Sequence, residues 1–267
     1  MHSIPLDIFV RILGFFISSD SLRYRRRHIQ FVRLVCQDWN DVVISTPEFW
    51  RGISIHIGLR PHANIADTSI VGSQQLHQHL ERAGNDMGLD VHLTLGSPRF
   101  HDSLRLAIQL ALSRARCISI YARHLDLSTV ANLFLDVLSR DRLEVLRIWA
   151  GPIPTAELAT SPFPGLIHCT RLSFLGLPAP LPAFIHSDSV TSLELYRPSH
   201  ADIEVLPTHF PNLTTLYVTD PQQVTGSPIH FPNLLGLYVR SFQPTQGILD
   251  HISAPNLTIT YVTVHRW

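Results

Sequence analysis

The residues that could do chemistry are numerous, but they form no recognised catalytic arrangement. The chain has 16 histidines, yet none lies in an H-E-x-x-H motif. His77 and His79 are two positions apart on an expected helix, so their side chains would point to different faces. The chain also lacks a G-x-S-x-G, a P-loop and a G-x-G-x-x-G motif. We therefore expect no metal, no cofactor and no enzymatic activity; a hydrolase with its site in the loops is a weaker alternative.

The number and spacing of the cysteines indicate neither disulfide bonds nor a zinc site. Cys36, Cys117 and Cys169 are an odd set with no C-x-x-C spacing. This pattern speaks against a disulfide framework and against a zinc knuckle. We expect three buried thiols in a reducing compartment.

Composition bounds the kind of protein and its partners. With 267 residues and 45% hydrophobic residues, the chain can build a sizeable core and is not wholly disordered. Its formal net charge is zero, so its overall charge does not favour binding to nucleic acid or to an anionic membrane. Its apolar runs are shorter than the roughly 18 residues of a membrane helix, and its start lacks a basic n-region. We expect a cytoplasmic or nuclear protein.

Two amphipathic helices are expected at the start of the chain. Pro5 suits the first turn of a helix in which Ile8 and Ile12 are four residues apart. The Arg-rich run at residues 23–28 is expected to be a solvated loop. A second helix should then bury its apolar face against the first, forming a core separate from the rest of the chain. That face consists of Val32, Val35, Cys36, Trp39 and Val43.

Helices and strands are expected to alternate after this head. The spacing of apolar residues predicts strands at 53–57, 91–95, 117–121 and 143–149, with helices at 73–82 and 102–114 and a third beginning at Ser128. A shorter template, Leu-x-x-Leu-x-Leu, then repeats in units that begin 18 to 29 residues apart, close to the period of leucine-rich repeats. The units begin at Leu143, Leu172, Val190, Leu213, Leu234 and Leu257.

The repeat predicts a solenoid of parallel strands whose Leu and Val side chains point inward. Three units share a Pro-Asn-Leu lead-in, and its proline keeps the chain extended before each strand. The regular asparagine at the end of each strand is missing, so little asparagine ladder and loose outer turns are expected.

Four segments of the head, taken in order, resemble an F-box, particularly the fungal F-box-like type that closes with S-T-P-x-x-W. They are residues 4–8 (IPLDI, with Asp7 where the family usually has Glu), 12–13 (IL), 35–39 (VCQDW) and 45–50 (STPEFW). The resemblance extends to about residue 95 through the segments LERAG and LDVHLTL. The later repeats are similar to the irregular leucine-rich repeats common in F-box proteins.

The resemblance implies an α/β fold in which a short all-α F-box-like head, residues 1–52, precedes an irregular leucine-rich-repeat-like solenoid with a parallel sheet, residues 53–267. It implies a substrate-recognition adaptor of a ubiquitin ligase, in which the head docks a Skp-type adaptor and through it a cullin scaffold. The alternative is an interaction scaffold whose head merely caps the solenoid and recruits no ligase. By resemblance the adaptor-binding residues are Ile4, Pro5, Leu6, Ile8, Ile12, Val35 and Cys36.

A protein substrate is expected to bind the open face of the repeats. The fifth template positions should form one row across the sheet, running Arg147, Gly176, Glu194, Tyr217, Tyr238, Tyr261. Tyrosine suits strands and forms stabilising cross-strand pairs, so this row could be purely structural. Tyrosine, tryptophan and arginine also dominate binding hot spots. The substrate-binding candidates are Tyr121, Arg147, Trp149, Tyr196, Tyr217, Tyr238, Arg240 and Tyr261.

The absence of lysine generates the first testable prediction. All 21 basic residues are arginine, so a chain placed beside a ubiquitin-transferring enzyme offers no lysine amine. In a reconstituted ligase reaction we expect the wild type to stay largely unmodified. A variant with Arg60→Lys, Arg99→Lys and Arg140→Lys should become ubiquitinated. Equal modification of both proteins would leave codon usage as the explanation.

Overall fold

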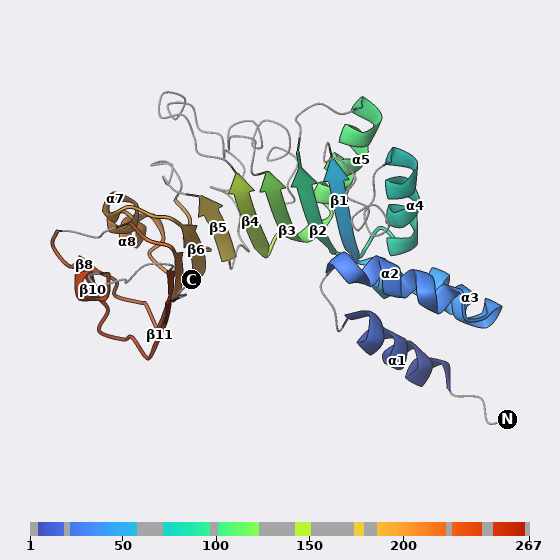
Figure 1. The fold of residues 1–267 in the computed structure, drawn as a ribbon, viewed down its shortest axis with the longest axis horizontal. Coiled ribbons are helices and arrows are strands. Elements are labelled where there is room, and N and C mark those ends of the chain that lie inside the picture. Colours follow the sequence, from blue (N-terminus) through green and yellow to red (C-terminus); the bar gives the residue numbers. More distant parts are fainter. Residues whose placement is uncertain are drawn as a thin grey trace. The chain divides into compact units, whose positions relative to one another are not determined.

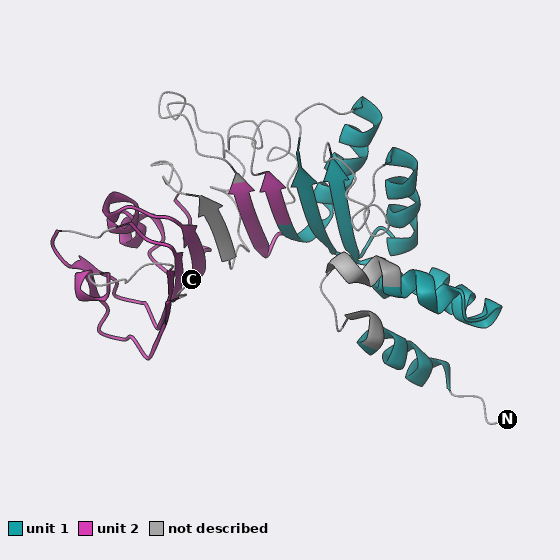
Figure 2. Ribbon diagram, in the orientation of Figure 1, with its two compact units in different colours: residues 1–118 teal, residues 119–267 magenta. Residues whose placement is uncertain are grey.

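The computed structural model describes residues 5–18, 22–57, 72–96, 101–122, 142–150, 174–178, 186–222, 226–241 and 248–264. The fold is mixed α/β, with several helices and parallel strands along the chain (Figure 1). The chain forms two compact units, residues 1–118 and residues 119–267 (Figure 2). Within the described ranges, the helices are too short or too polar for any of them to cross a membrane.

The first unit begins with four short helices. They are α1 (Leu6–Ser18), α2 (Leu22–Arg33), α3 (Gln37–Ser45) and the 3-10 helix η1 (Pro47–Trp50). Pro5 lies just before α1, and its carbonyl accepts a hydrogen bond from the Phe9 amide at 3.0 Å. Residues 23–28 lie inside α2, so the predicted loop is wrong. The run has no Gly or Pro to end a helix, and arginine is a good helix former.

The second predicted helix is divided in two. Helix α2 ends at Arg33, and Cys36, in an extended conformation, is the N-cap of α3. Val35 and Cys36 are therefore exposed in the turn, whereas Val32 and Val43 are buried. The prediction of one continuous apolar face is wrong, because a spacing of three and four residues does not show where a turn interrupts the helix.

The helices of the head pack through aromatic side chains. The rings of Phe9 on α1 and Trp39 on α3 meet edge to face, with centroids 4.8 Å apart. Phe49 and Trp50 of η1 are buried, and the Trp50 indole N–H donates to the Val43 carbonyl at 2.8 Å. The prediction that the upstream helix packs against the second one is thus confirmed.

Strands and helices alternate through the rest of the first unit, as the sequence predicts. The elements are β1 (Gly52–Ile57), α4 (Ser73–Ala83), β2 (Leu89–Leu95), α5 (Asp102–Ser113) and β3 (Ala115–Ala122), the last continuing past residue 118. Strands β1 and β2 pair in parallel and place Ile53 beside Val91 and Ile55 beside Leu93. Leu76 and Leu80 of α4 are buried with these strand residues in the core of the unit.

The head and the next elements share a core. The His79 ring on α4 donates from Nε2 to the Trp50 carbonyl at 2.6 Å, and the Arg82 guanidinium lies 4.6 Å from the Trp50 ring centroid. The expectation of separate cores is therefore wrong. A head this small buries too little of its own surface to do without such contacts. The domain boundary after residue 52 stays a prediction.

The second unit contains a parallel sheet built from the repeat. Its strands lie in the order β4 (Val145–Ala150), β5 (Phe174–Pro178), β6 (Ser192–Tyr196), β7 (Thr215–Thr219), β9 (Gly236–Ser241) and β11 (Ile259–Val264). Short helices, α7 (His200–Glu204) and α8 (Leu206–His209), connect β6 to β7. The two-residue strands β8 (Ile229–His230) and β10 (Ile252–Ser253) pair separately, and η3 (Leu249–His251) precedes β10.

The inward positions of the template are confirmed for four strands. The fourth and sixth template residues are almost completely buried on β4, β6, β7 and β9, whereas Thr260 and Val262 on β11 are exposed. The buried set is Leu146, Ile148, Leu193, Leu195, Leu216, Val218, Leu237 and Val239. The unit beginning at Leu172 is described only from Phe174, and the helix predicted at Ser128 lies outside the described residues.

An asparagine ladder joins consecutive repeats, contrary to the expectation of little ladder. The asparagines belong to the Pro-Asn-Leu lead-ins before the strands, and each donates its side-chain amide to a carbonyl of the preceding repeat. The bonds are Asn212 Nδ2 to Asp188 O at 2.9 Å, Asn233 Nδ2 to Pro211 O at 2.9 Å and Asn256 Nδ2 to Pro232 O at 2.8 Å. The ladder was missed because it lies before each strand.

We expect Asn233→Asp to destabilise the protein by about 1 kcal/mol, the typical net value of one hydrogen bond. Aspartate keeps the shape of the side chain but has no N–H to donate. The measurement is the free energy of unfolding in urea. Asn85→Asp, at an exposed asparagine between α4 and β2, is the matched control. An equal loss in both variants would show that the ladder bond contributes nothing specific.

Candidate functional site

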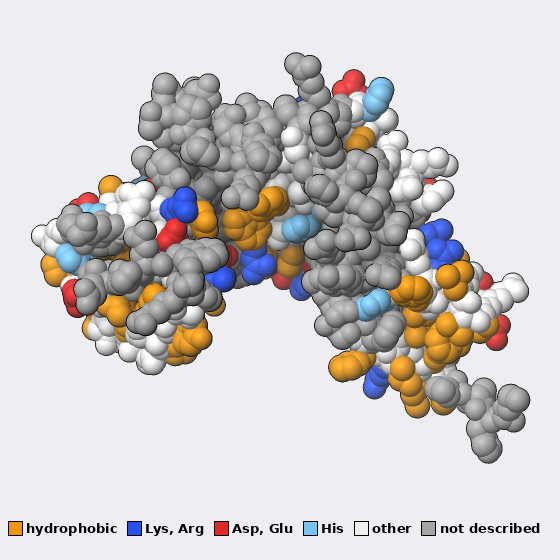
Figure 3. Space-filling model, viewed as in Figure 1, with side chains coloured by type: hydrophobic (Ala, Val, Ile, Leu, Met, Phe, Trp, Pro, Cys, Tyr) orange, Lys and Arg blue, Asp and Glu red, His pale blue; other side chains and the backbone are white. Residues whose placement is uncertain are grey.

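Two surfaces contain many of the predicted site residues, one in each compact unit. The first is an apolar surface on the head helices, which we call the head surface. Figure 3 shows hydrophobic side chains gathered over the helices α1 to α3. The head surface consists of the exposed large hydrophobic residues Leu6, Ile8, Ile12, Phe15, Phe31, Leu34 and Val35.

The predicted adaptor-binding residues lie on or beside the head surface. Leu6, Ile8, Ile12 and Val35 are exposed, with between 46% and 63% of their surface accessible. Pro5 and Cys36 are exposed as well, and Ile4 lies outside the described residues. Helix α1 thus places Leu13 in the core and the predicted residues in solvent. An isolated exposed apolar residue needs no explanation, but a cluster of this size is typical of an interaction site.

Sequence reasoning missed three members of the head surface. Phe15 and Leu34 each expose 82% of their surface, and Phe31 is also more than half exposed. Phe15 follows Ile12 by three residues and Ile8 by seven, so the helical period already placed it on the same face. Leu34 could not be found in this way, because it is the interruption after α2 that turns it outward.

The cysteines differ from the expectation of buried thiols. Cys36 is exposed at the start of α3, and Cys117 on β3 is half-buried. Cys169 lies outside the described residues. The helix break decides the exposure of Cys36, because the thiol sits in a turn and not on a buried helix face.

The second surface is the row of fifth template positions on the sheet of residues 119–267. Strand register places Arg147 beside Gly176, Gly176 beside Glu194 and Glu194 beside Tyr217. The row continues with Tyr217 beside Tyr238 and Tyr238 beside Tyr261. The predicted order of the row is confirmed at every step. Parallel pairing at a constant register produces such a row whenever the repeats are equivalent.

The tyrosines of this row form a continuous aromatic surface. The rings of Tyr217 and Tyr238 stack with centroids 4.6 Å apart and planes 15° apart, and the Tyr261 ring lies 6.4 Å from that of Tyr238. A Cβ atom at Gly236 would come within 3.2 Å of the Tyr238 ring, so glycine there leaves room for the stack. Tyr261 is 60% exposed at the end of the row.

A groove of about 280 Å³ lies along the tyrosines. Glu194, Arg240 and Thr263 line it together with Tyr217, Tyr238 and Tyr261. We call this set of six residues the tyrosine groove. It presents aromatic rings with one carboxylate and one guanidinium, a combination suited to binding a polypeptide.

Glu194 is the charged group most affected by its position in the groove. Burial raises the pKa of the Glu194 carboxyl, and the nearby Arg147 guanidinium acts in the opposite direction. Arg147 and Glu194 lie on either side of Gly176 in the row. The row therefore places a carboxylate at a partly desolvated position beside Tyr217. Sequence reasoning put Glu194 in the row but not among the binding residues.

The remaining predicted substrate residues are more dispersed. Tyr196 is exposed on β6, where the Arg197 guanidinium lies 5.5 Å from its ring centroid. Tyr121 is exposed on β3, and Trp149 is half-buried on β4. The structure brings Tyr217, Tyr238, Arg240 and Tyr261 together in the groove, but it does not place Tyr121, Arg147, Trp149 or Tyr196 among the groove residues.

Metal ligands are not clustered in the part of the chain that the structure describes, where no three His, Cys, Asp or Glu side chains could hold an ion together. His77 is exposed and His79 buried on the same helix, which confirms that they point in different directions. No model of a known protein family matches the chain, and no curated protein is similar to it. The likeness to F-box proteins is thus carried by the residues quoted above.

A prediction on pH follows from Glu194. Its folded-state pKa is raised, so on raising the pH the unfolded chain loses this proton first and the folded state is progressively disfavoured. As the pH rises from the pKa of Glu194 in the unfolded chain to its pKa in the folded chain, the free energy of unfolding of the wild type should fall. Glu194→Gln should remove that loss, so its stability relative to the wild type should improve from acid to neutral pH.

The measurement is chemical unfolding of both proteins at a series of pH values. Glu204→Gln, at an exposed glutamate of α7, is the control. A constant difference between Glu194→Gln and the wild type across the series would contradict the prediction.

Proposed function

We propose that this chain is the substrate-recognition subunit of a cullin-based ubiquitin ligase. In this proposal the head is F-box-like and docks a Skp-type adaptor, while the later repeats form a leucine-rich-repeat-like solenoid that holds a protein substrate. The chain itself makes and breaks no bond. Its role is to bring the substrate to the ubiquitin-transferring enzyme.

The exposed head surface is the observation that carries the proposal. Helix α1 contributes Phe9 and Leu13 to packing within the head, yet it also presents Ile8, Ile12 and Phe15 to solvent. Exposing this much apolar surface is unfavourable unless another protein covers it. We infer from the F-box resemblance that a Skp-type adaptor is that protein, because the exposed residues include those that the resemblance assigns to docking.

The tyrosine groove supports the substrate-binding half of the proposal. Its aromatic rings are partly exposed and arranged in one row, so they offer large contact area with little loss of side-chain freedom. An extended or irregular segment of a substrate could lie along the row and place polar groups against Glu194 and Arg240. The structural role of the tyrosine stack is compatible with this use.

The rival proposal, a scaffold without ligase recruitment, is favoured by one observation. Trp50, His79 and Arg82 join the head to α4, so the head packs against the first helix that follows it, whatever else it binds. An N-terminal cap would need these contacts, but it would not need apolar residues on the outer side of α1.

Capture of a Skp-type adaptor and a cullin separates the two proposals. We expect Pro5→Ala combined with Ile8→Ala to weaken adaptor binding at least about tenfold, because hot-spot side chains contribute at least about 2 kcal/mol. Leu106→Ala combined with Leu110→Ala is the matched control, since both leucines are exposed on α5 outside the head. The control should bind the adaptor as the wild type does.

Two further arms complete this experiment. Tyr217→Thr combined with Tyr238→Thr should keep adaptor capture and lose substrate, because none of the residues lining the groove belongs to the head. A folded wild type that captures no adaptor would favour the scaffold. For the ubiquitination test, Arg60, Arg99 and Arg140 lie outside the described residues, whereas Arg105 and Arg142 are exposed and provide better-defined lysine positions.

A further inference from the structure

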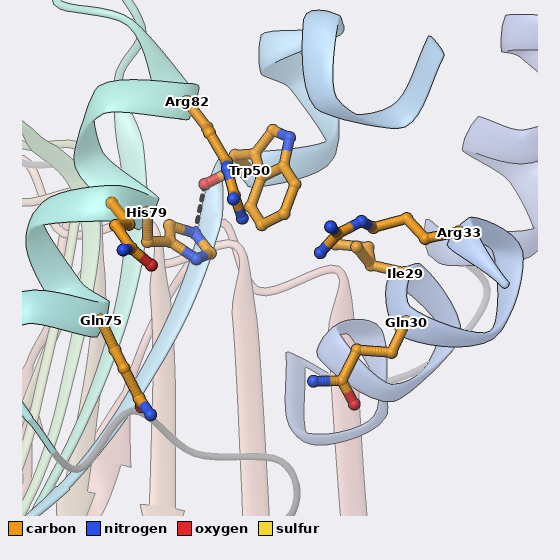
Figure 4. A pocket seen from close by; sticks show the side chains of 8 residues that line it. Ile29, Gln30, Arg33, Trp50, Gln75, His79 and Arg82 are labelled. Atoms are coloured by element: carbon orange, nitrogen blue, oxygen red, sulfur yellow. Dashed lines mark hydrogen bonds between the residues drawn. The ribbon is translucent and has the colours of Figure 1, made fainter. Parts of the chain in front are cut away.

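A small cavity lies within the first unit, between α2, η1 and α4. Its volume is about 70 Å³, and its lining includes Arg33, Arg82, Trp50, Gln30, Gln75 and Gln78. Figure 4 shows Arg33 extending from α2 and Arg82 extending from α4 toward the middle of the cavity, beside Trp50. The adaptor and substrate surfaces described above do not include these residues.

Contacts within the unit hold both guanidinium groups in place. Arg82 lies over the Trp50 ring at 4.6 Å from its centroid, and Trp50 is itself fixed by its bond to the Val43 carbonyl. Arg33 donates its Nε–H to the Asn40 side-chain oxygen at 2.8 Å. This bond orients the guanidinium, whose other nitrogens can still donate. Both cations are thus positioned before any ligand arrives, which lowers the entropy lost on binding.

The charges around the cavity are unbalanced. The pKa of Arg82 is lowered first by burial and then by Arg33, whose like charge outweighs the opposing effect of Glu81. The described residues that line the cavity supply two guanidiniums and three amides, but no carboxylate. Neither Arg33 nor Arg82 is among the ion pairs of the described residues. An anion between the two guanidiniums would relieve their repulsion.

We propose that this cavity is a binding site for a phosphate group, either inorganic phosphate or the phosphoryl group of a small molecule. A carboxylate has two oxygens and matches one guanidinium fork, whereas a phosphate group has enough oxygens for forks from two directions. Gln30, Gln75 and Gln78 also line the cavity, and a side-chain amide can donate hydrogen bonds to a phosphate oxygen. The small volume accommodates a single phosphate group and leaves a larger ligand outside.

Bound phosphate would join the head to α4, because Arg33 belongs to α2 and Arg82 to α4. A ligand that binds the folded chain but not the unfolded chain stabilises the fold, and the stabilisation grows with ligand concentration. This site is independent of the proposed ligase role, since neither arginine belongs to the head surface or to the tyrosine groove.

Thermal unfolding of the full chain in inorganic phosphate tests the proposal. The expected result is a saturable rise in the unfolding midpoint that sodium chloride of equal ionic strength does not reproduce. Arg33→Gln should weaken phosphate binding at least about tenfold, because a hydrogen bond to a charged group is worth about 1.5–3 kcal/mol. Arg105→Gln, at an exposed arginine of α5, is the matched control and should respond like the wild type.

A second variant separates binding from folding. Gln78 precedes Arg82 by four residues on α4 and lines the same cavity. Gln78→Glu therefore places a carboxylate where it can pair with Arg82 in the favourable i, i+4 orientation. We expect this variant to fold without phosphate and to lose the response to phosphate.

Free phosphoserine in place of phosphate distinguishes the two sources of the ligand. A response equal to that of phosphate shows that the cavity takes the phosphoryl group of a larger molecule, and a response to phosphate alone shows that it takes the free anion. The proposal is overturned if phosphate acts no differently from chloride on the wild type. It is also overturned if Gln78→Glu and Arg33→Gln both respond to phosphate as the wild type does.

Discussion

Parallel pairing at one constant register is the constraint on which the unit of residues 119–267 depends. Because side chains alternate between the two faces of a strand, a slip of one residue would expose the buried leucines and bury the tyrosines. The asparagine bonds from Asn212, Asn233 and Asn256 link consecutive repeats just before the strands, so they favour the native register. The same register that buries Leu216 and Leu237 also stacks Tyr217 on Tyr238. The buried core and the tyrosine row are thus two results of one pairing.

In the unit of residues 1–118, the packing of the other elements depends on Trp50. Its indole N–H donates to the Val43 carbonyl, its own carbonyl accepts a hydrogen bond from His79, and its ring lies beneath the Arg82 guanidinium. These contacts use the inner sides of the head helices. The outer side of α1, with Ile8, Ile12 and Phe15, is left to solvent and is available to a partner. Packing around Trp50 also brings Arg33 and Arg82 to the same cavity, although they are 49 positions apart in the chain.

Much of the fold could be predicted because its signals are local and repeated. The alternation of Leu and Val at 193–195, 216–218 and 237–239 is a period-two pattern that recurs in three consecutive repeats, so the positions and buried faces of β6, β7 and β9 were predicted correctly. The pattern around residues 32–43 was misread because a turn and a continuous helix can share the same apolar spacing. The asparagine ladder was also missed, since its asparagines lie in the lead-ins before the strands, whereas the ladder was sought at the strand ends.

The strand period, the order of the row from Arg147 to Tyr261 and the apolar character of the head could all be read from the sequence, because each depends on residue type at regular spacing. Folding selects which apolar residues of the head face solvent, since this depends on the break at residues 34–36 and on the packing of Phe9 against Trp39. It alone placed Glu194 at a partly buried position in the tyrosine groove, and it alone brought Arg33 near Arg82. Burial and electrostatic repulsion depend on which groups are close in space, and residues far apart in the chain come close together only when it folds.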